Sequence, residues 1–363
     1  MAKGFTLETY PWVYMAKYNE DGNWIEEYLE NPHKTPAEEA AMSPEALAAI
    51  LASRNSFPQL PLVNYTTQYG MGCFEGLKAF PQKNGSLKLF RPDENGTRMN
   101  SSMKGLMMPP FPSDKFIEAS RKVVELNQDC GFFPKYDPEW EKDNYITGHS
   151  VYLRPFTYSE SAIGLGIAQQ PWMIIVATPV GAYFAPGNSK AVVTNRSRAT
   201  PHGTGWIKCN ANYVVPTLAK KEAMNKGFME AIFLDSTEQK YVEEGSSCNI
   251  FFKLKNGTLI TPELGDTILP GINRKSVITL AEDQAVKVEE RKVPIDEVMA
   301  DAVEAFVTGT AAGVSYLESV TYKDKTAVFN GGKQGELTTE LQKQLKNIQY
   351  GASEDKRKWM FDI

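Results

Sequence analysis

The sequence predicts a mixed α/β fold of two domains, and three observations support that prediction. A chain of 363 residues is longer than one hydrophobic core usually supports. Beyond residue 190, short apolar runs typical of strands alternate with helical patterns. The segment 181–189 is rich in glycine and proline and lies between two strand patterns, as linkers often do. We expect a smaller N-terminal α/β domain at 1–180, an interdomain linker at 181–189 and a larger C-terminal α/β domain at 190–363.

In the N-terminal part only a few elements give clear signals. Residues 1–60 mix aromatic and acidic side chains, and one convincing helix runs over 44–53 with Ser43 as its N-cap. The dipeptide Asn84-Gly85 separates two apolar runs and predicts a hairpin turn. The other expected elements are a helix over 114–128, capped by Ser113 and stopped by Gly131, and strands over 151–154 and 172–178.

The C-terminal part alternates more regularly between the two kinds of pattern. Helices are expected after Asn212, from Asn273, over 295–302 and, as a long amphipathic helix, over 337–350. Strands are expected over 191–194, 231–234, 249–253, 259–261, 286–289 and 305–307.

Composition excludes several classes of partner. The net charge is −5 and no long basic block is present, which argues against nucleic acid and against an anionic membrane surface. The most apolar segment, 172–180, is too short to span a bilayer. Behind the first three residues there is no uninterrupted apolar stretch as long as that of a signal peptide. The four cysteines lie far apart and fit no metal spacing, as is usual in a reducing compartment. We therefore expect a soluble cytoplasmic protein.

Several common motifs are incomplete. Gly164-Leu165-Gly166 lacks the third glycine of a dinucleotide site, and 331–333 lacks the upstream glycine and the following Ser or Thr of a P-loop. The histidines His33, His149 and His202 are scattered, and no hydrolase or zinc-protease motif occurs. The sequence thus predicts neither a metal site nor a nucleophilic hydrolase.

The segment around Lys208 is the strongest candidate for chemistry. Lys208 follows the apolar pair Trp206-Ile207 and precedes a run of small and polar residues that opens a helix. A lysine held out of bulk water loses its charge more readily, and its neutral amine can then attack a carbonyl. Tyr213, near the start of the helix, is expected to lie close to it. Taken alone, such a lysine more often reaches to solvent from the end of a strand.

Three further segments suit an aldehyde cofactor that carries a phosphate. A Pro-Gly turn at 270–271 feeds a helix whose first N–H groups, at Ile272 and Asn273, can hold an anion. The small residues at 307–313 expose further N–H groups and hydroxyls. Glu244 precedes a glycine turn and an apolar strand. Each segment alone is as easily an ordinary turn, loop or strand edge, and only their combination points to a site.

Together these segments resemble the class IV, fold-type IV pyridoxal-phosphate aminotransferases, with the D-amino-acid-aminotransferase-like fold, and specifically the branched-chain aminotransferases. The resemblance covers roughly 64–361, and its most specific motif is Glu244-x-Ser246-x-x-Asn249-Ile250-Phe251. The supporting motifs are Gln68-Tyr69-Gly70, Phe74-Glu75-Gly76-Leu77-Lys78-Ala79-Phe80, Tyr152-Leu153-Arg154-Pro155, Gly181-Ala182-Tyr183-Phe184, Leu269-Pro270-Gly271 and Gly309-Thr310-Ala311.

The resemblance implies roles for particular residues toward pyridoxal 5'-phosphate. Lys208 would hold the cofactor and move the proton at the substrate α-carbon, and Glu244 would face the pyridine nitrogen. Tyr213 would hydrogen-bond the phenolic oxygen of the cofactor. The phosphate would be bound by Arg98, the amides of Ile272 and Asn273, and the hydroxyl of Thr310.

The resemblance also implies a substrate site. The amides around Thr310 and Ala311, with Tyr152, would bind the α-carboxylate, and Arg154 would pair with a side-chain carboxylate. The apolar side-chain pocket would be walled by Tyr69, Phe74 and Tyr183.

The activity implied is transamination between leucine, isoleucine or valine and 2-oxoglutarate, giving branched-chain 2-oxo acids and L-glutamate, in a homodimer. A D-amino-acid aminotransferase and an aminodeoxychorismate lyase are the alternatives within the family, and a catalytically silent binding protein is the alternative outside it. The run Cys209-Asn210-Ala211 departs from the family, whose members usually carry more glycine there. Neither this run nor the loosely matching residues 1–60 include a catalytic group.

Overall fold

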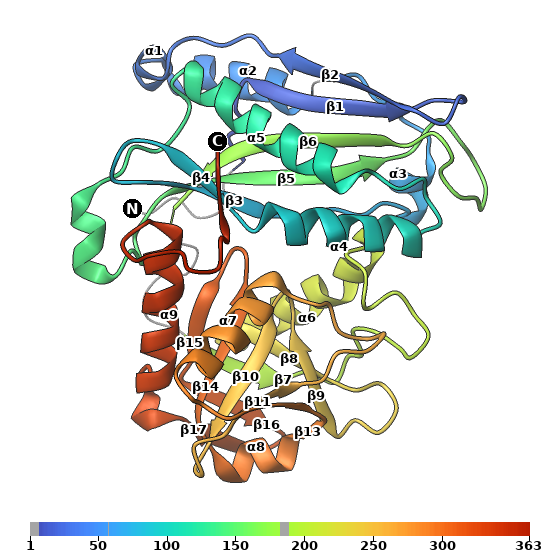
Figure 1. Cartoon of the computed structure of the whole chain (residues 1–363). Coiled ribbons are helices and arrows are strands. Elements are labelled where there is room, and N and C mark those ends of the chain that lie inside the picture. The colour runs from blue at the N-terminus through green and yellow to red at the C-terminus, as the bar shows by residue number, and fades with distance from the viewer. Residues whose placement is uncertain (1–6, 57, 182–188) are drawn as a thin grey trace. The chain divides into compact units, whose positions relative to one another are not determined.

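The computed structural model describes residues 7–56, 58–181 and 189–363 (Figure 1). Its contacts divide the chain into two compact units, which are described separately below. Unit 1 comprises Met1–Tyr183, Cys209–Ala211 and Ile348–Ile363, and unit 2 comprises Phe184–Lys208 and Asn212–Asn347. Most of the linker expected over 181–189 lies outside the described residues.

Unit 1 is built on an antiparallel sheet of seven strands in the order β18-β4-β3-β5-β6-β1-β2. The strands are β1 (Trp12–Tyr18), β2 (Trp24–Glu30), β3 (Leu77–Pro81), β4 (Leu87–Phe90), β5 (Ser150–Tyr158), β6 (Trp172–Val180) and β18 (Met360–Asp362). The last strand pairs with β4, and this pairing joins the C-terminal segment to unit 1.

Helices pack on this sheet, and α5 lies against β1 and β6 (Figure 1). Its buried face carries Phe116, Val123 and Val124, which repeat at helical spacing. The helices are α1 (Pro36–Ala40), α2 (Pro44–Asn55), α3 (Tyr65–Tyr69), α4 (Pro92–Gly105), α5 (Ser113–Asp129) and the 3₁₀ helix η1 (Pro138–Asp143).

Two local predictions in this unit are confirmed and one is wrong. The Ser43 hydroxyl caps α2 by accepting from the Ala46 N–H at 3.2 Å, and Gly85, at φ 85°, turns between β3 and β4. Ser113 is not the cap of α5, because the helix begins at Ser113 itself and its hydroxyl instead accepts from Asn100 Nδ2 at 3.0 Å. The strands β1 and β2 were not predicted at all.

Unit 2 contains two sheets that share one apolar core. The sheet β12-β11-β10-β14-β15 and the sheet β13-β9-β8-β7-β16-β17 both contribute to it, for example Phe252 from β10 and Ile232 from β8. The strands are β7 (Lys190–Val193), β8 (Glu230–Leu234), β9 (Tyr241–Gly245), β10 (Asn249–Leu254), β11 (Leu259–Pro262), β12 (Val288–Arg291), β13 (Val293–Pro294), β14 (Ala302–Gly309), β15 (Gly313–Leu317), β16 (Ser319–Tyr322) and β17 (Lys325–Val328).

The helices of unit 2 follow the predicted order. They are α6 (Val214–Asn225), α7 (Ile272–Asp283), α8 (Ile295–Asp301), α9 (Glu336–Gln349) and the 3₁₀ helices η2 (Asn210–Tyr213) and η3 (Asn330–Gly332), of which η2 begins and α9 ends with two residues that belong to unit 1. The start of α9 is held by Glu304, whose carboxylate accepts from the Thr338 N–H at 3.0 Å and hydroxyl at 2.9 Å. Among the described helices, none is both long and apolar enough to cross a membrane.

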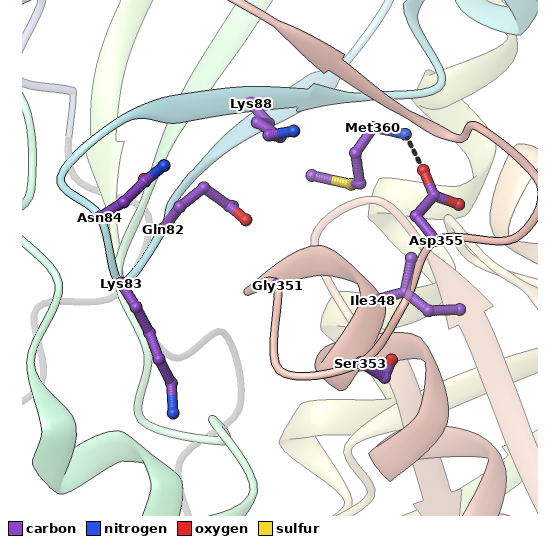
Figure 2. Close-up of a pocket in the computed structure, with 9 residues that line it drawn as sticks. All are labelled: Gln82, Lys83, Asn84, Lys88, Ile348, Gly351, Ser353, Asp355 and Met360. Atoms are coloured by element: carbon purple, nitrogen blue, oxygen red, sulfur yellow. Dashed lines mark hydrogen bonds between the residues drawn. The ribbon is translucent and has the colours of Figure 1, made fainter.

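A crevice of about 350 Å³ lies in unit 1 between the β3–β4 hairpin and the C-terminal segment (Figure 2). Asp355 accepts there from the Met360 N–H at 2.7 Å. Its two lysines are engaged by carboxylates, Lys83 by Glu141 and Lys88 by Asp362, each at 2.9 Å. The crevice contains none of the residues that the sequence indicates for chemistry.

Candidate active site

The lysine singled out from the sequence contacts the tyrosine that follows it. Lys208 Nζ donates to Tyr213 Oη at 2.7 Å, which confirms their expected proximity. Ile207 is buried and Lys208 is half-buried, so the amine has an apolar neighbour on one side. The 3₁₀ helix η2 ends at Tyr213, and its tight turns bring a residue five positions on back toward Lys208.

Glu244 lies in β9 and is 3% exposed. Burial raises its pKa to about 7, and the Arg198 guanidinium, with which it forms an ion pair, opposes that rise. The Glu243 carboxylate raises the pKa further, whereas the Lys208 ammonium lowers it. Asn249 Nδ2 also donates to Glu244, at 3.3 Å. The charge of this carboxyl near neutral pH therefore depends on which cations face it.

The first turn of α7 has the form expected of an anion site. Its N-cap, Gly271, provides no side-chain acceptor, and the first helical N–H groups belong to the buried Ile272 and Asn273. A Cβ at Gly271 would lie 1.9 Å from Asn249 Oδ1, so only glycine fits at that position. Asn249 in turn donates to the Leu269 carbonyl at 2.9 Å and fixes the turn.

A second backbone segment is tied to the first. Asn273 Nδ2 donates to the Gly309 carbonyl at 2.8 Å and joins the start of α7 to the end of β14. Thr310 and Ala311 follow directly in the turn between β14 and β15. The buried hydroxyl of Thr308 has no hydrogen-bond partner among the described residues. An unpaired buried hydroxyl is costly unless a ligand serves it, so this end of β14 is suited to binding a polar group.

Unit 1 contains several of the residues that the resemblance assigns to substrate. Tyr152 and Arg154 lie two residues apart on β5 and so share a face. Arg154 Nη2 donates to Tyr152 Oη at 2.9 Å, and the guanidinium lies 4.6 Å from the centre of the Phe74 ring. Arg154 Nε is buried and has no partner in the described part of the chain. Tyr69, the last residue of α3, is exposed.

Arg98 also lies in unit 1, on α4, where it is paired with a carboxylate. Its Nε and Nη2 donate to the two oxygens of Glu75 at 2.7 and 2.8 Å. Asn95 Nδ2 donates to the same carboxylate at 2.7 Å, and both Glu75 and Arg98 are buried. Tyr183, the remaining predicted residue, lies outside the described residues.

Sequence reasoning missed the partner of Glu244. Arg198 lies in an irregular segment before Lys208, and its Nη1 and Nη2 donate to the carbonyls of Thr267 and Gly205 at 3.1 and 3.2 Å. No motif or periodicity marks this arginine, and only the fold brings it to Glu244. The predicted residues in unit 2 are Lys208, Tyr213, Glu244, Ile272, Asn273, Thr310 and Ala311, and those in unit 1 are Tyr69, Phe74, Arg98, Tyr152 and Arg154.

Comparison with known sequences gives consistent matches. The family described as amino-transferase class IV matches residues 72–320. A relative from Humulus lupulus, branched-chain amino acid aminotransferase 1, mitochondrial, is 37% identical over 368 residues, which cover 99% of this chain and 83% of the relative. A probable branched-chain-amino-acid aminotransferase from Staphylococcus aureus (strain MRSA252) is 39% identical over 301 residues, or 80% of each chain.

Comparison with solved structures also gives matches to branched-chain aminotransferases. The Escherichia coli branched-chain amino acid aminotransferase matches with a TM-score of 0.71 and 28% identity, over 85% of this chain and 95% of that one. The branched-chain aminotransferase of the archaeon Thermoproteus uzoniensis, solved with norvaline, matches with a TM-score of 0.74, over 97% of this chain and 99% of that one. At 24% identity the second match bears on the fold alone. The predicted fold class is confirmed.

Proposed function

Because the chain belongs to the class IV aminotransferases, we propose that it transfers the amino group of leucine, isoleucine or valine to 2-oxoglutarate with pyridoxal 5'-phosphate as its cofactor. The family predicted from the sequence is confirmed by the matches. The observation that carries the proposal is the contact between the Lys208 amine and the Tyr213 hydroxyl, in the same unit as the buried Glu244.

The residues of unit 2 fit this cofactor. Lys208 supplies the amine that would hold its aldehyde carbon, and Tyr213 supplies a hydroxyl for its phenolic oxygen. The free first turn of α7, the close approach at Gly271 and the unpaired Thr308 hydroxyl suit a phosphate. We assign the phosphate to the Ile272 and Asn273 amides, the Thr310 hydroxyl and the Arg98 guanidinium, which Glu75 holds in one orientation.

Each polar group would have a distinct task. When bound, pyridoxal 5'-phosphate withdraws electrons from the substrate α-carbon. The Lys208 amine, which donates to the Tyr213 hydroxyl, would move the proton at the substrate α-carbon. Glu244, as a carboxylate, would face the ring nitrogen and favour its protonated form, and the ion pair with Arg198 would fix the orientation of Glu244.

The residues that we assign to the substrate fall into two sets, one for its charged groups and one for its apolar side chain. The amides of Thr310 and Ala311, with the Tyr152 hydroxyl, would bind the α-carboxylate, and Tyr69, Phe74 and Tyr183 would contact an aliphatic side chain. Arg154 would pair with the side-chain carboxylate of glutamate. The buried Arg154 Nε, with no partner among the described residues, supports this assignment, because a buried N–H requires an acceptor.

A panel of amino donors and 2-oxo acids, with both stereoisomers of each amino acid, tests the proposal on the holoenzyme. We expect leucine, isoleucine and valine in their L forms to react with 2-oxoglutarate. Preference for D-alanine, or release of pyruvate from aminodeoxychorismate, would favour the two alternatives within the family. Absence of turnover with every pair, and of a cofactor absorption band, would favour a binding protein.

We also propose a cytoplasmic homodimer. Exposed apolar side chains on two hydrogen-bonded loops of unit 1 support a dimer, among them Leu62, Ile163 and Leu165, the last 91% exposed. All four cysteines are free thiols, as in a reducing compartment. Light scattering during size exclusion tests the first assignment, and cell fractionation tests the second, since the relative from Humulus lupulus is mitochondrial.

A further inference from the structure

Three side chains with metal-binding atoms meet in unit 1, and the proposed function uses none of them. One carboxylate oxygen of Glu30, one ring nitrogen of His33 and the sulfur of Cys130 all lie within 4.8 Å of one another. We propose that these three residues form a binding site for a single Zn²⁺ ion, with the fourth position open to water.

The backbone that carries the first two ligands is well anchored. Glu30 ends β2 and pairs with Trp12 across the sheet. The next residue, Asn31, is buried, and both its N–H and its side-chain Nδ2 donate to the Pro11 carbonyl, at 3.0 and 3.1 Å. The direction in which the chain leaves the strand toward His33 is therefore fixed before any ion binds.

The third ligand is fixed by the end of a helix. Cys130 is the C-cap of α5, and its N–H donates back to the Leu126 carbonyl. Gly131, at φ 84°, then reverses the chain, and the Phe132 N–H closes the helix by donating to the Asn127 carbonyl at 2.8 Å. The Phe132 ring lies 5.7 Å from the His33 ring in an edge-on contact, so the same turn that positions the thiol also positions the imidazole.

The electrostatic environment favours a cation. The carbonyl groups at the end of a helix of 17 residues give its C-terminus a partial negative charge, and Cys130 lies at that end. Glu30 adds a carboxylate whose Oε1 lies 3.7 Å from His33 Nδ1. The same Nδ1 lies 3.2 Å from the Asn31 carbonyl oxygen. An ion bound at Nε2 would leave this Nδ1 contact in place as the support that orients the ring, whereas an ion bound at Nδ1 would replace it.

The donor set selects the ion. A thiolate and an imidazole are ligands of Zn²⁺ and of other borderline metals, whereas Ca²⁺ and Mg²⁺ bind oxygen. Zinc bond lengths place neighbouring ligand atoms about 3.3–3.7 Å apart in a tetrahedron, so a pair at the 4.8 Å limit would have to close by about 1 Å, whereas Glu30 Oε1 and His33 Nδ1 are already 3.7 Å apart. The Glu30 side chain is 46% exposed and can make that movement by changing rotamer. Cys130 and His33 are half-buried, which leaves an entry path for the ion.

Spectroscopic titration of the tag-free holoenzyme with Co²⁺ tests the site. Tetrahedral Co²⁺ with a thiolate ligand absorbs in the red, where pyridoxal does not, and Zn²⁺ should abolish that band by displacement. We expect one equivalent per chain, and at least a tenfold loss of affinity in Cys130→Ser and in His33→Gln. The matched controls are Glu27→Gln, an exposed glutamate on the same strand, and His202→Gln, a histidine whose side chain is 97% exposed; both should bind as the unaltered chain does.

Alkylation gives a second readout that does not depend on the spectrum. Cys73, Cys209 and Cys248 are buried, so iodoacetamide should react first with Cys130, and Zn²⁺ should protect it. Peptide mass spectrometry locates the modified residue. A missing red band together with unprotected Cys130, or a band that persists in Cys130→Ser, would overturn the proposal.

Discussion

Each unit of the molecule contains a buried ion pair between a glutamate and an arginine, and the two pairs differ in how completely they are satisfied. In unit 1, Glu75 is 0% exposed and accepts from Arg98 twice, from Asn95 and from the Gly76 N–H. In unit 2, Glu244 pairs with Arg198 and accepts from the Leu269 N–H and, at the longer distance of 3.3 Å, from Asn249, while burial raises its pKa to about 7.

This difference indicates that the Glu75 carboxylate has a structural role and that the Glu244 carboxylate is suited to a chemical one. A carboxylate with four donors around it is held in one orientation, and its removal would deprive the buried Arg98 guanidinium of two hydrogen bonds to a charged acceptor. A carboxylate whose charge is nearly balanced between burial and nearby cations can respond to a further cation, such as a protonated ring nitrogen. The same two residue types therefore stabilise unit 1 and orient Arg98, the proposed phosphate ligand, whereas in unit 2 they would take part in the proton chemistry.

The largest expected effect comes from Lys208→Ala, which leaves both ion pairs intact. We expect turnover to fall by at least about 10⁴-fold, because the variant lacks both the nucleophile and the proton carrier. Stopped-flow single turnovers measure the rate, and borohydride reduction followed by peptide mass spectrometry shows which lysine holds the cofactor. Lys221→Ala, which alters an exposed lysine on α6, is the matched control. Cofactor trapped on another lysine would contradict the assignment.

The two ion pairs should respond in opposite ways to the same substitution. In Glu244→Gln we expect the proton-transfer step to slow by orders of magnitude, since each ~1.4 kcal/mol lost from the transition state costs about tenfold. In Glu75→Gln we expect a loss of about 3–5 kcal/mol of unfolding free energy, because a buried arginine loses its charged partner. Stopped-flow rates and urea unfolding of both variants measure the two quantities. A comparable loss of stability in both variants would remove the distinction.

A further substitution tests whether Arg154, a half-buried arginine of unit 1, has a binding role. Arg154→Met should weaken the glutamate half-reaction by ~2–5 kcal/mol and the leucine half-reaction much less, since only glutamate brings a second carboxylate. Stopped-flow measurements on the two cofactor forms follow each half-reaction separately. An equal decline in both would mean that Arg154 only supports Tyr152 and Phe74, with which it is in contact.

The sequence predicted contacts between residues that are close together along the chain, but not contacts between distant residues. Lys208 and Tyr213 are five residues apart, and one turn of 3₁₀ helix brings them together, so their contact could be predicted. Glu75 pairs with Arg98, 23 residues away, and Arg198 pairs with Glu244, 46 residues away. Neither separation follows a helix or strand period, so the sequence pattern did not predict either pair. Arg98 and Glu244 received roles only through the family resemblance, and their pairing with Glu75 and Arg198 required the folded chain.

The missed elements have a similar explanation. Every second residue of a half-buried strand is normally apolar, but β2 is an edge strand with no fully buried side chain, so its sequence lacks that alternation. The C-terminal segment joins unit 1 through pairing of Phe361 with Leu89, which only the folded chain reveals. The zinc ligands proposed above likewise come from two segments about one hundred residues apart, so no spacing rule could find them.

The smallest expected effect concerns the pH dependence of stability in the cofactor-free protein. The pKa of Glu244 is about 7 in the folded chain, above its ordinary value of 4.5. Between these two values the folded protein keeps a proton that the unfolded chain has lost, so stability falls as the pH rises through this window. The full difference amounts to about 3 kcal/mol, and Glu244→Gln should abolish it because glutamine does not titrate.

Urea unfolding of the cofactor-free chain and of Glu244→Gln, from about pH 5 to about pH 8, measures this difference. Subtracting the two series cancels the carboxyl groups they share, and the remaining curve should decline with pH by about 3 kcal/mol. The cofactor should reduce the decline, because a protonated ring nitrogen stabilises the charged form of Glu244. Parallel curves for the two proteins would mean that Arg198 keeps Glu244 ionised throughout. The pair in unit 2 would then be a structural support like the pair in unit 1, and the contrast between the units would not hold.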